Sequence, residues 1–290
     1  MFAQLLQTLA PNHRLLRTWN LTGGVSAQVT ALEILTPTGE THRWVARQHG
    51  TRDHTRNPHL AADEYQLLQL LYAAGVPVPA PLHLIPSGIF PDPLLIVEYI
   101  EGHTDFAPAD LEPYLTQLAA HLAHLHQLDP APFTFLPKHT PIPPPSDHLD
   151  DSLSESQIRA ALLTLSPPLP YPSTLLHGDY WPGNLLWRAG QLVAILDWED
   201  AALGHPLADV ANTRLELLWA FGQTAQETFT HLYQTFNPLP PTTLPYWDLC
   251  AALRPAGKLS SWGLAKTTEN IMREHHKAFV EQALRQLNLS

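Results

Sequence analysis

Apolar residues recur with two different periods along the chain, and the change of period predicts a β-rich start followed by helices. Residues 18–35 read as two extended segments, and residues 43–49 read as a third strand. From residue 57 to residue 75 the apolar positions take a helical spacing, which a glycine and two prolines then end. Residues 93–100 are a continuous apolar run that predicts a further buried strand. A small sheet with one helix is therefore expected first.

Helical patterns dominate the rest of the chain. Residues 109–128, 203–236 and 246–288 carry leucines and other apolar residues at helical spacing. Between them, residues 137–152 are too rich in proline for regular structure and predict an exposed, polyproline-like insertion. We place the boundary between the two parts near residues 98–104. The pattern predicts the α+β fold class.

Composition narrows the possible classes of protein. The chain of 290 residues is 44% hydrophobic and has one cysteine, so it can fill a core but cannot form an internal disulfide. The first residues lack the features of a secretory signal, and no apolar run approaches the roughly 20 residues of a membrane span. We expect a cytoplasmic protein that binds no membrane.

The charge of the chain narrows the possible partners. The net charge is −11, with 27 acidic and 16 basic residues, which argues against nucleic acid as a partner and would favour a cationic ligand. The histidines at 121, 124 and 126 do not share one helical face, and no further ligand completes a set, so a metal site there is not expected.

The segment "LLHGDYWPGNLLW" and the residues after it carry the candidate chemistry. Residues 184–198 read as strand, turn and strand, with Gly190 permitting the turn. If the turn centres there, Asn184 pairs near Ile195, and Asp197 lies only about 7 Å further along the strand. An amide oxygen and a carboxylate completed by water and phosphate suit Mg²⁺ rather than zinc.

Asp179 precedes Asn184 by five residues on the preceding loop and would project beside that ion. A carboxylate there can accept a proton from a hydroxyl group. A positioned base and an ion that bridges phosphates are the requirements of phosphoryl transfer to an alcohol. The alternative is a polar loop and a strand-end aspartate that only cap and turn the chain.

The motif His177-x-Asp179-x-x-x-x-Asn184, with Asp197 at the end of the next strand, resembles the catalytic and metal-binding segments of the aminoglycoside phosphotransferase family. The resemblance covers nearly the whole chain and is strongest from 175 to 211. It implies a bilobal, protein-kinase-like fold, with a nucleotide-binding lobe at 1–98 and a catalytic and acceptor-binding lobe at 99–290. It also implies ATP, or GTP, and Mg²⁺ as cofactors, with Asp179 as the catalytic base and Asn184 and Asp197 as metal ligands.

In the first lobe the resemblance implies a set of cofactor-binding residues. The phosphate loop would contain Gly23, Gly24 and Ser26, the ion pair would join Arg47 to Glu64, and the hinge backbone at Glu98 and Ile100 would meet the purine. The family has lysine where this chain has Arg47. Arginine keeps the charge and can pair bidentately, but its planar fork is not a point charge.

Other polar and aromatic residues near the motif have two interpretations each. Tyr180 and Trp181 either line the acceptor pocket or pack between the loop and the helices, and His177 is expected to order the loop. The resemblance makes Asp209 a buried anchor for the loop. Three further acidic residues either grip the ammonium groups of a cationic acceptor or are solvated surface residues: Glu199, Asp200 and Glu216.

The acceptor itself stays open. An aminoglycoside-like small molecule is the first interpretation, and homoserine, choline, a macrolide or a sugar are alternatives, because the motifs identify the reaction and not the alcohol. A nucleotide-binding regulatory protein with a degenerate site is a second hypothesis, motivated by Arg47. A metal-dependent hydrolase would need more ligands than the sequence offers.

Overall fold

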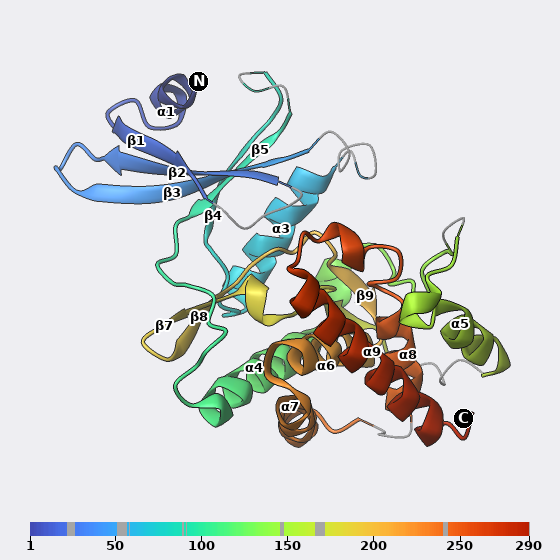
Figure 1. Ribbon diagram of the computed structural model, residues 1–290. Coiled ribbons are helices and arrows are strands. Elements are labelled where there is room, and N and C mark those ends of the chain that lie inside the picture. Colours follow the sequence, from blue (N-terminus) through green and yellow to red (C-terminus); the bar gives the residue numbers. More distant parts are fainter. Residues whose placement is uncertain are drawn as a thin grey trace. The chain divides into compact units, whose positions relative to one another are not determined.

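The structure is a computed structural model that divides into two compact units (Figure 1). The N-terminal unit comprises Met1–His103 and Val193–Glu199, and the C-terminal unit comprises Thr104–Leu192 and Asp200–Ser290. The lobe boundary at residue 98 stays a prediction. The structure describes these residues: 1–21, 27–50, 57, 59–88, 90, 92–145, 148–165, 172–239 and 243–289.

The N-terminal unit is built on a five-stranded antiparallel sheet with the strand order β1-β2-β3-β5-β4. Its elements are α1 (Phe2–Leu9), β1 (Arg14–Asn20), β2 (Ala27–Leu35), β3 (Thr41–His49), α3 (Leu60–Ala73), β4 (Pro81–Ile85) and β5 (Leu94–Glu98). The residues Leu94–Val97 of β5 are all buried, since this strand has neighbours on both sides. β4 lies at the sheet edge, where its initial proline removes no ladder hydrogen bond.

The two faces of this sheet are covered differently. Leu5 and Leu6 of α1 pack against Ile34 of β2 and Ile96 of β5 on one face. α3 packs against β4 and β5. Each fully buried aliphatic side chain of this kind contributes about 1.5 to 3 kcal/mol. α1 was not predicted, because a helix of eight residues gives too short a period to read.

The C-terminal unit is mainly helical. Its helices are α4 (Leu111–His126), α5 (Glu155–Thr164), α6 (Leu207–Phe221), α7 (Gln223–Phe236), α8 (Leu244–Ala252) and α9 (Lys266–Gln286). α6 packs against α7, α8 and α9, and α4 packs against α7, as Figure 1 shows. None of the helices in the described ranges is long and apolar enough to cross a membrane.

Short strands carry the motif segment. β6 (Thr174–Leu176) pairs antiparallel with β9 (Ala202–Gly204), and β7 (Leu185–Arg188) pairs with β8 (Gln191–Ile195). The turn between β7 and β8 has positive φ at both Ala189 and Gly190, at 50° and 73°. This is the backbone of a two-residue hairpin, so the predicted strand, turn and strand are confirmed.

Helices and strands in these two units confirm the predicted α+β fold class. In the proline-rich segment 137–152, the predicted lack of helix and strand is confirmed for the described residues up to Asp150, apart from an isolated bridge between Lys138 and Leu203. Several of these residues are half-buried rather than exposed. The helical pattern predicted for 246–288 is confirmed in α8 and α9, which are separate helices because Pro255 cannot continue α8.

Candidate active site

The loop that follows β6 begins with a glycine that no other residue can replace without strain. Gly178 has φ +84°, and a Cβ atom there would lie 2.1 Å from the backbone oxygen of Asp200. Both the left-handed backbone and the close approach exclude a side chain. The loop therefore packs directly on the segment at Asp200.

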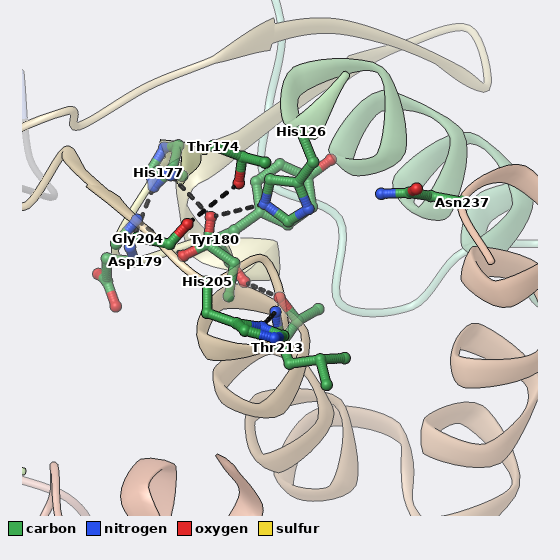
Figure 2. A network of polar contacts seen from close by, with 12 residues as sticks. His126, Thr174, His177, Asp179, Tyr180, Gly204, His205, Thr213 and Asn237 are labelled. Atoms are coloured by element: carbon green, nitrogen blue, oxygen red, sulfur yellow. Dashed lines mark hydrogen bonds and ion pairs between the residues drawn. The ribbon is translucent and has the colours of Figure 1, made fainter. Parts of the chain in front are cut away.

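A buried carboxylate anchors this loop. Asp209, in the first turn of α6, accepts hydrogen bonds from the backbone N–H groups of His177, at 2.7 Å, and Gly178, at 2.9 Å. His126 of α4 contacts the same carboxylate at 3.2 Å through Nε2, and its Nδ1 lies 2.7 Å from the Tyr233 hydroxyl. The predicted anchor is confirmed, and Figure 2 shows His126 and His177 in this network with Asp179 directed away from it.

The electrostatics of the anchor favour the charged form. Burial by itself would raise the pKa of Asp209, but the hydrogen bond and charge of His126, followed by His177, outweigh it and hold the pKa below its ordinary value. An ionised carboxylate that accepts two backbone N–H bonds fixes the start of the loop.

The next loop residues are held by hydrogen bonds within the loop and to the helices α4 and α6. His177 Nδ1 accepts from the N–H of Asp179 at 3.1 Å, which gives His177 the loop-ordering role expected of it. Tyr180 is fully buried, its hydroxyl donates to the Leu118 carbonyl at 3.0 Å, and its own carbonyl accepts from the Thr213 hydroxyl at 2.8 Å. Of the two interpretations of Tyr180, packing is confirmed.

Trp181 is half-buried, and its ring lies 6.0 Å from that of Phe106, centroid to centroid. A Cβ atom on Gly183 would lie 2.3 Å from the Trp181 ring. This aromatic side chain thus folds over the turn before Asn184, and whether it also meets the acceptor stays a prediction.

Asp179 and Asn184 contact each other directly. Asn184 Nδ2 donates to the Asp179 carbonyl at 2.9 Å and to Asp179 Oδ2 at 3.1 Å. Since the nitrogen of the amide makes these bonds, its oxygen is the atom that would ligate a cation. Asn184 is buried and the Asp179 side chain is about one-third exposed, so the carboxylate can be reached by a hydroxyl group.

A second cluster of charged residues lies within the N-terminal unit, around Arg47 of β3. Its Nε lies 3.4 Å from Oε1 of Glu64 on α3, and its Nη2 lies 3.3 Å from Oδ1 of Asp197 and 3.5 Å from Oε1 of Glu199. The expected pair between Arg47 and Glu64 is present. His49, two residues along the same strand, also contacts Glu64, at 2.7 Å.

Ionisation in this cluster follows from its burial and charges. Burial would raise the pKa of Glu64, but Arg47 and then His49 lower it below its ordinary value. Burial would lower the pKa of Arg47, and the carboxylates of Glu64, Asp197 and Glu199 raise it. The cluster therefore holds the Arg47 guanidinium against an ionised Glu64 carboxylate.

Asp197 itself has an unusual backbone. Its φ is +64°, in the left-handed region that costs most residues about 1 kcal/mol or more and that aspartate tolerates better. Trp198 Nε1 donates to the Ile195 carbonyl at 3.1 Å and closes this turn. Asn184 and Asp197 belong to different units, so their convergence on one ion stays a prediction.

The remaining predicted cofactor-binding residues are those of the phosphate loop and the hinge. Gly23, Gly24 and Ser26 lie outside the described residues. Glu98 ends β5, and its backbone N–H donates to the Ala80 carbonyl at 2.9 Å. The hinge role of Glu98 and Ile100 stays a prediction.

The three acidic candidates for a cationic acceptor have separate surroundings. Glu199 pairs with Arg47, as above, and Asp200 Oδ2 lies 3.7 Å from Nη2 of Arg254. Glu216 of α6 is half-buried, and burial, followed by the charge of Asp179, raises its pKa to about 8. At neutral pH Glu216 is therefore mostly protonated, which weakens its case as an ammonium ligand.

The raised pKa of Glu216 predicts how stability depends on pH. A carboxyl group whose pKa is higher in the folded state favours folding at low pH, and this contribution is lost as pH rises from 4.5 to about 8. Glu216→Gln should therefore nearly match the wild type in Tm at pH 5 and exceed it by a larger margin at pH 7 and again at pH 9. Thermal unfolding at the three pH values measures this. The exposed Glu227→Gln on α7 serves as control, and equal Tm differences at all pH values would contradict the assignment.

Sequence reasoning missed His49, His126 and Arg254. His126 is part of "HLAHLHQL", where the histidine spacing gave no sign of a buried partner. Arg254 follows the apolar run "WDLCAAL", and an isolated arginine at the end of a buried helix is the signal that could have found it.

Comparisons with known proteins agree with this geometry. A model of the phosphotransferase enzyme family matches residues 20–246. The mouse protein acyl-CoA dehydrogenase family member 10 is 31% identical over 182 residues, which cover 54% of this chain and 17% of that protein. The chain spans between 17% and 24% of the length of the curated relatives it matches.

Two solved structures show the likeness in fold. The GDP complex of wild-type aminoglycoside 2'-phosphotransferase-IIIa superposes with a TM-score of 0.67 at 18% identity, over 99% of this chain and 96% of that chain. Amicoumacin kinase hAmiN in complex with AMP-PNP, Ca²⁺ and Ami gives a TM-score of 0.64 at 17% identity, over 96% of this chain and 93% of that chain. These matches confirm the predicted kinase-like fold class.

Proposed function

The chain belongs to the phosphotransferase enzyme family, and from this premise we propose that it transfers the γ-phosphoryl group of ATP to a hydroxyl group of a small molecule. The observation that carries the proposal is the anchored loop in which Asn184 donates to Asp179. A partly exposed carboxylate held by backbone and amide contacts is suited to accept a proton from an alcohol.

In the proposed mechanism Asp179 orients the acceptor hydroxyl and accepts its proton as the oxygen attacks the γ-phosphorus. Asn184 and Asp197 would hold Mg²⁺, whose donor preference their amide and carboxylate oxygens satisfy. When bound, the ion would neutralise charge that develops on the phosphate oxygens. Because the loop is already anchored, little free energy would be spent on reorganising Asp179 and Asn184 during the reaction.

Arg47 would contact the α- and β-phosphates, with Glu64 and His49 fixing its strand against α3. The phosphate loop with Gly23, Gly24 and Ser26 and the hinge at Glu98 and Ile100 complete the proposed nucleotide site. One of the two similar structures is a GDP complex and the other contains AMP-PNP, so proteins of this fold bind guanine as well as adenine nucleotides. We propose ATP as donor, with GTP as the alternative.

For the acceptor, we propose an aminoglycoside-like molecule first and homoserine, choline, a macrolide or a sugar as alternatives. The net charge of −11 supports a cationic acceptor over an anionic one by general attraction only. We propose no membrane or nucleic-acid partner and a cytoplasmic location.

The test is ADP release from ATP and Mg²⁺ across a panel of aminoglycosides, macrolides, amino alcohols and sugars. Transfer of ³²P to one acceptor class by the wild type, with a rate about 10³-fold lower for Asp179→Asn, would support both the reaction and that class. Nucleotide binding without transfer to any acceptor in the panel would instead favour the regulatory hypothesis. Absence of nucleotide binding would contradict both.

A further inference from the structure

Arg254 occupies a rigid position in the C-terminal unit. It follows α8, whose residues Leu244–Ala252 are all buried. Asp248 of this helix makes two 3.0 Å hydrogen bonds to the guanidinium of Arg214 on α6, which locks α8 against α6. Pro255 then turns the chain away. The backbone that carries Arg254 is thus fixed by buried packing and a bidentate ion pair.

The Arg254 guanidinium joins three groups from two loops. Nη1 donates to the carbonyl of Gly178, and Nη2 lies 3.3 Å from Oδ1 of Asp179 and 3.7 Å from Oδ2 of Asp200. Gly178 and Asp179 belong to the anchored loop after β6, whereas Asp200 lies at the point where that loop packs on the following segment. A single planar fork therefore holds both loops.

The contacts of Asp179 divide between its two oxygens. Oδ2 accepts from Asn184, and Oδ1 faces Arg254. Together these two donors define the plane of the carboxylate, and neither alone would do so. The Arg254 and Asp179 side chains are both about one-third exposed.

We propose that Arg254 is a positioning residue for phosphoryl transfer, which orients the Asp179 carboxylate and holds the loop after β6 against the segment at Asp200. The inference rests on the proposed function, because it takes Asp179 as the base. Arg254 acts through Asp179 and does not itself contact the nucleotide.

The test compares Arg254→Met, which removes the charge and the fork, with Arg254→Lys, which keeps the charge but loses the planar fork. We expect Arg254→Met to lower kcat by about 30- to 100-fold, the effect of a base displaced by about 1 Å, with KM for ATP and ADP affinity changed less than about twofold. Arg254→Lys should recover part of kcat.

The matched control is Arg159→Met. Arg159 likewise joins a carboxylate, Glu155 at 2.8 Å, and a backbone carbonyl, Pro143 at 2.9 Å, but on α5. Loss of a merely structural contact would lower Tm in both variants without separating kcat from KM. A drop in kcat confined to the Arg254 variants would support the positioning role.

A double-mutant cycle with Asp179→Asn distinguishes this role from an independent one. If Arg254 acts through Asp179, Arg254→Lys or Arg254→Met should change the residual rate of Asp179→Asn by less than about twofold. The inference would be overturned if the fold-losses in kcat of the two single variants multiplied in the double variant. It would also be overturned if Arg254→Met kept the full kcat of the wild type. If Arg254→Met does not fold, Arg254→Lys in the same cycle decides.

The two proposals fail in different ways. A wild-type protein that binds no nucleotide and transfers phosphate to no acceptor, water included, would overturn the proposed function and this inference with it. A wild type that turns over, together with Arg254 variants of unchanged kcat, would overturn the inference alone.

Discussion

Replacement of Asp179 by asparagine is expected to lower kcat for phosphoryl transfer by about 10³-fold, within the range of general-base catalysis. Asparagine has nearly the same shape and can still accept the hydrogen bond from Asn184 Nδ2, so the loop should keep its conformation. It cannot accept the proton of the acceptor hydroxyl. ADP affinity in the presence of Mg²⁺ should change by less than about threefold, because Asp179 is not among the residues proposed to hold the nucleotide.

Initial rates of phosphate transfer and calorimetric titration with ADP measure the two quantities separately. Asp129→Asn is the control, since that carboxylate accepts a hydrogen bond in another loop of the same unit, from the backbone N–H of Ala131 at 3.0 Å. A rate for Asp179→Asn within about tenfold of the wild type would exclude Asp179 as the base.

Replacement of Asp209 by asparagine is expected to destabilise the fold by about 3 kcal/mol, the range for breaking a buried charged pair. The two backbone N–H groups of His177 and Gly178 both point at this carboxylate, and an amide offers only one acceptor oxygen to them. The other N–H would meet an NH₂ group. For a chain of this size Tm should fall by about 6 to 12 °C.

The pH dependence of this difference has a definite sign. Because the pKa of Asp209 is lowered in the folded state, its stabilising contribution is present above the ordinary carboxyl pKa and is lost as pH falls below it. The Tm gap between wild type and Asp209→Asn should therefore narrow in acid. Thermal unfolding at pH 7 and near pH 3 tests this, with the exposed Glu281→Gln as control, and an unchanged gap would contradict the anchoring role.

Sequence patterns predicted the elements whose signal is local. The hairpin after Asn184 needed only a turn glycine between two apolar runs, and the helix that carries Glu64 needed only its period. The strand Pro81–Ile85 was missed because Pro77 and Pro79, just before it, read only as a helix stop. Its own first residue, Pro81, is tolerated since the strand lies at a sheet edge. The strand order of the sheet would have to be known before this segment could be predicted as a strand.

In the candidate site, too, the sequence predicted the residues with a local signal and missed their distant partners. Asp179, Asn184 and Asp197 stood out by spacing, whereas the partners that hold them come from distant segments. His126 reaches Asp209 across 83 residues, and Arg254 reaches Asp179 across 75. Such contacts arise from packing of α4, α6 and α8, which periodicity alone does not specify. For the same reason the surroundings of Glu216 could not be foreseen.

The left-handed backbone of Asp197 determines which substitutions can report on the role of its side chain. Alanine at this position would remove the carboxylate and also force a Cβ-bearing residue without a compensating polar group into a disfavoured conformation. Lost activity would then mix a chemical effect with a conformational one. Asparagine tolerates the same backbone and removes only the charge, so it is the conformationally matched probe, and glycine would relieve the backbone while deleting the side chain. A comparison of the two separates ligand chemistry from chain geometry at one residue.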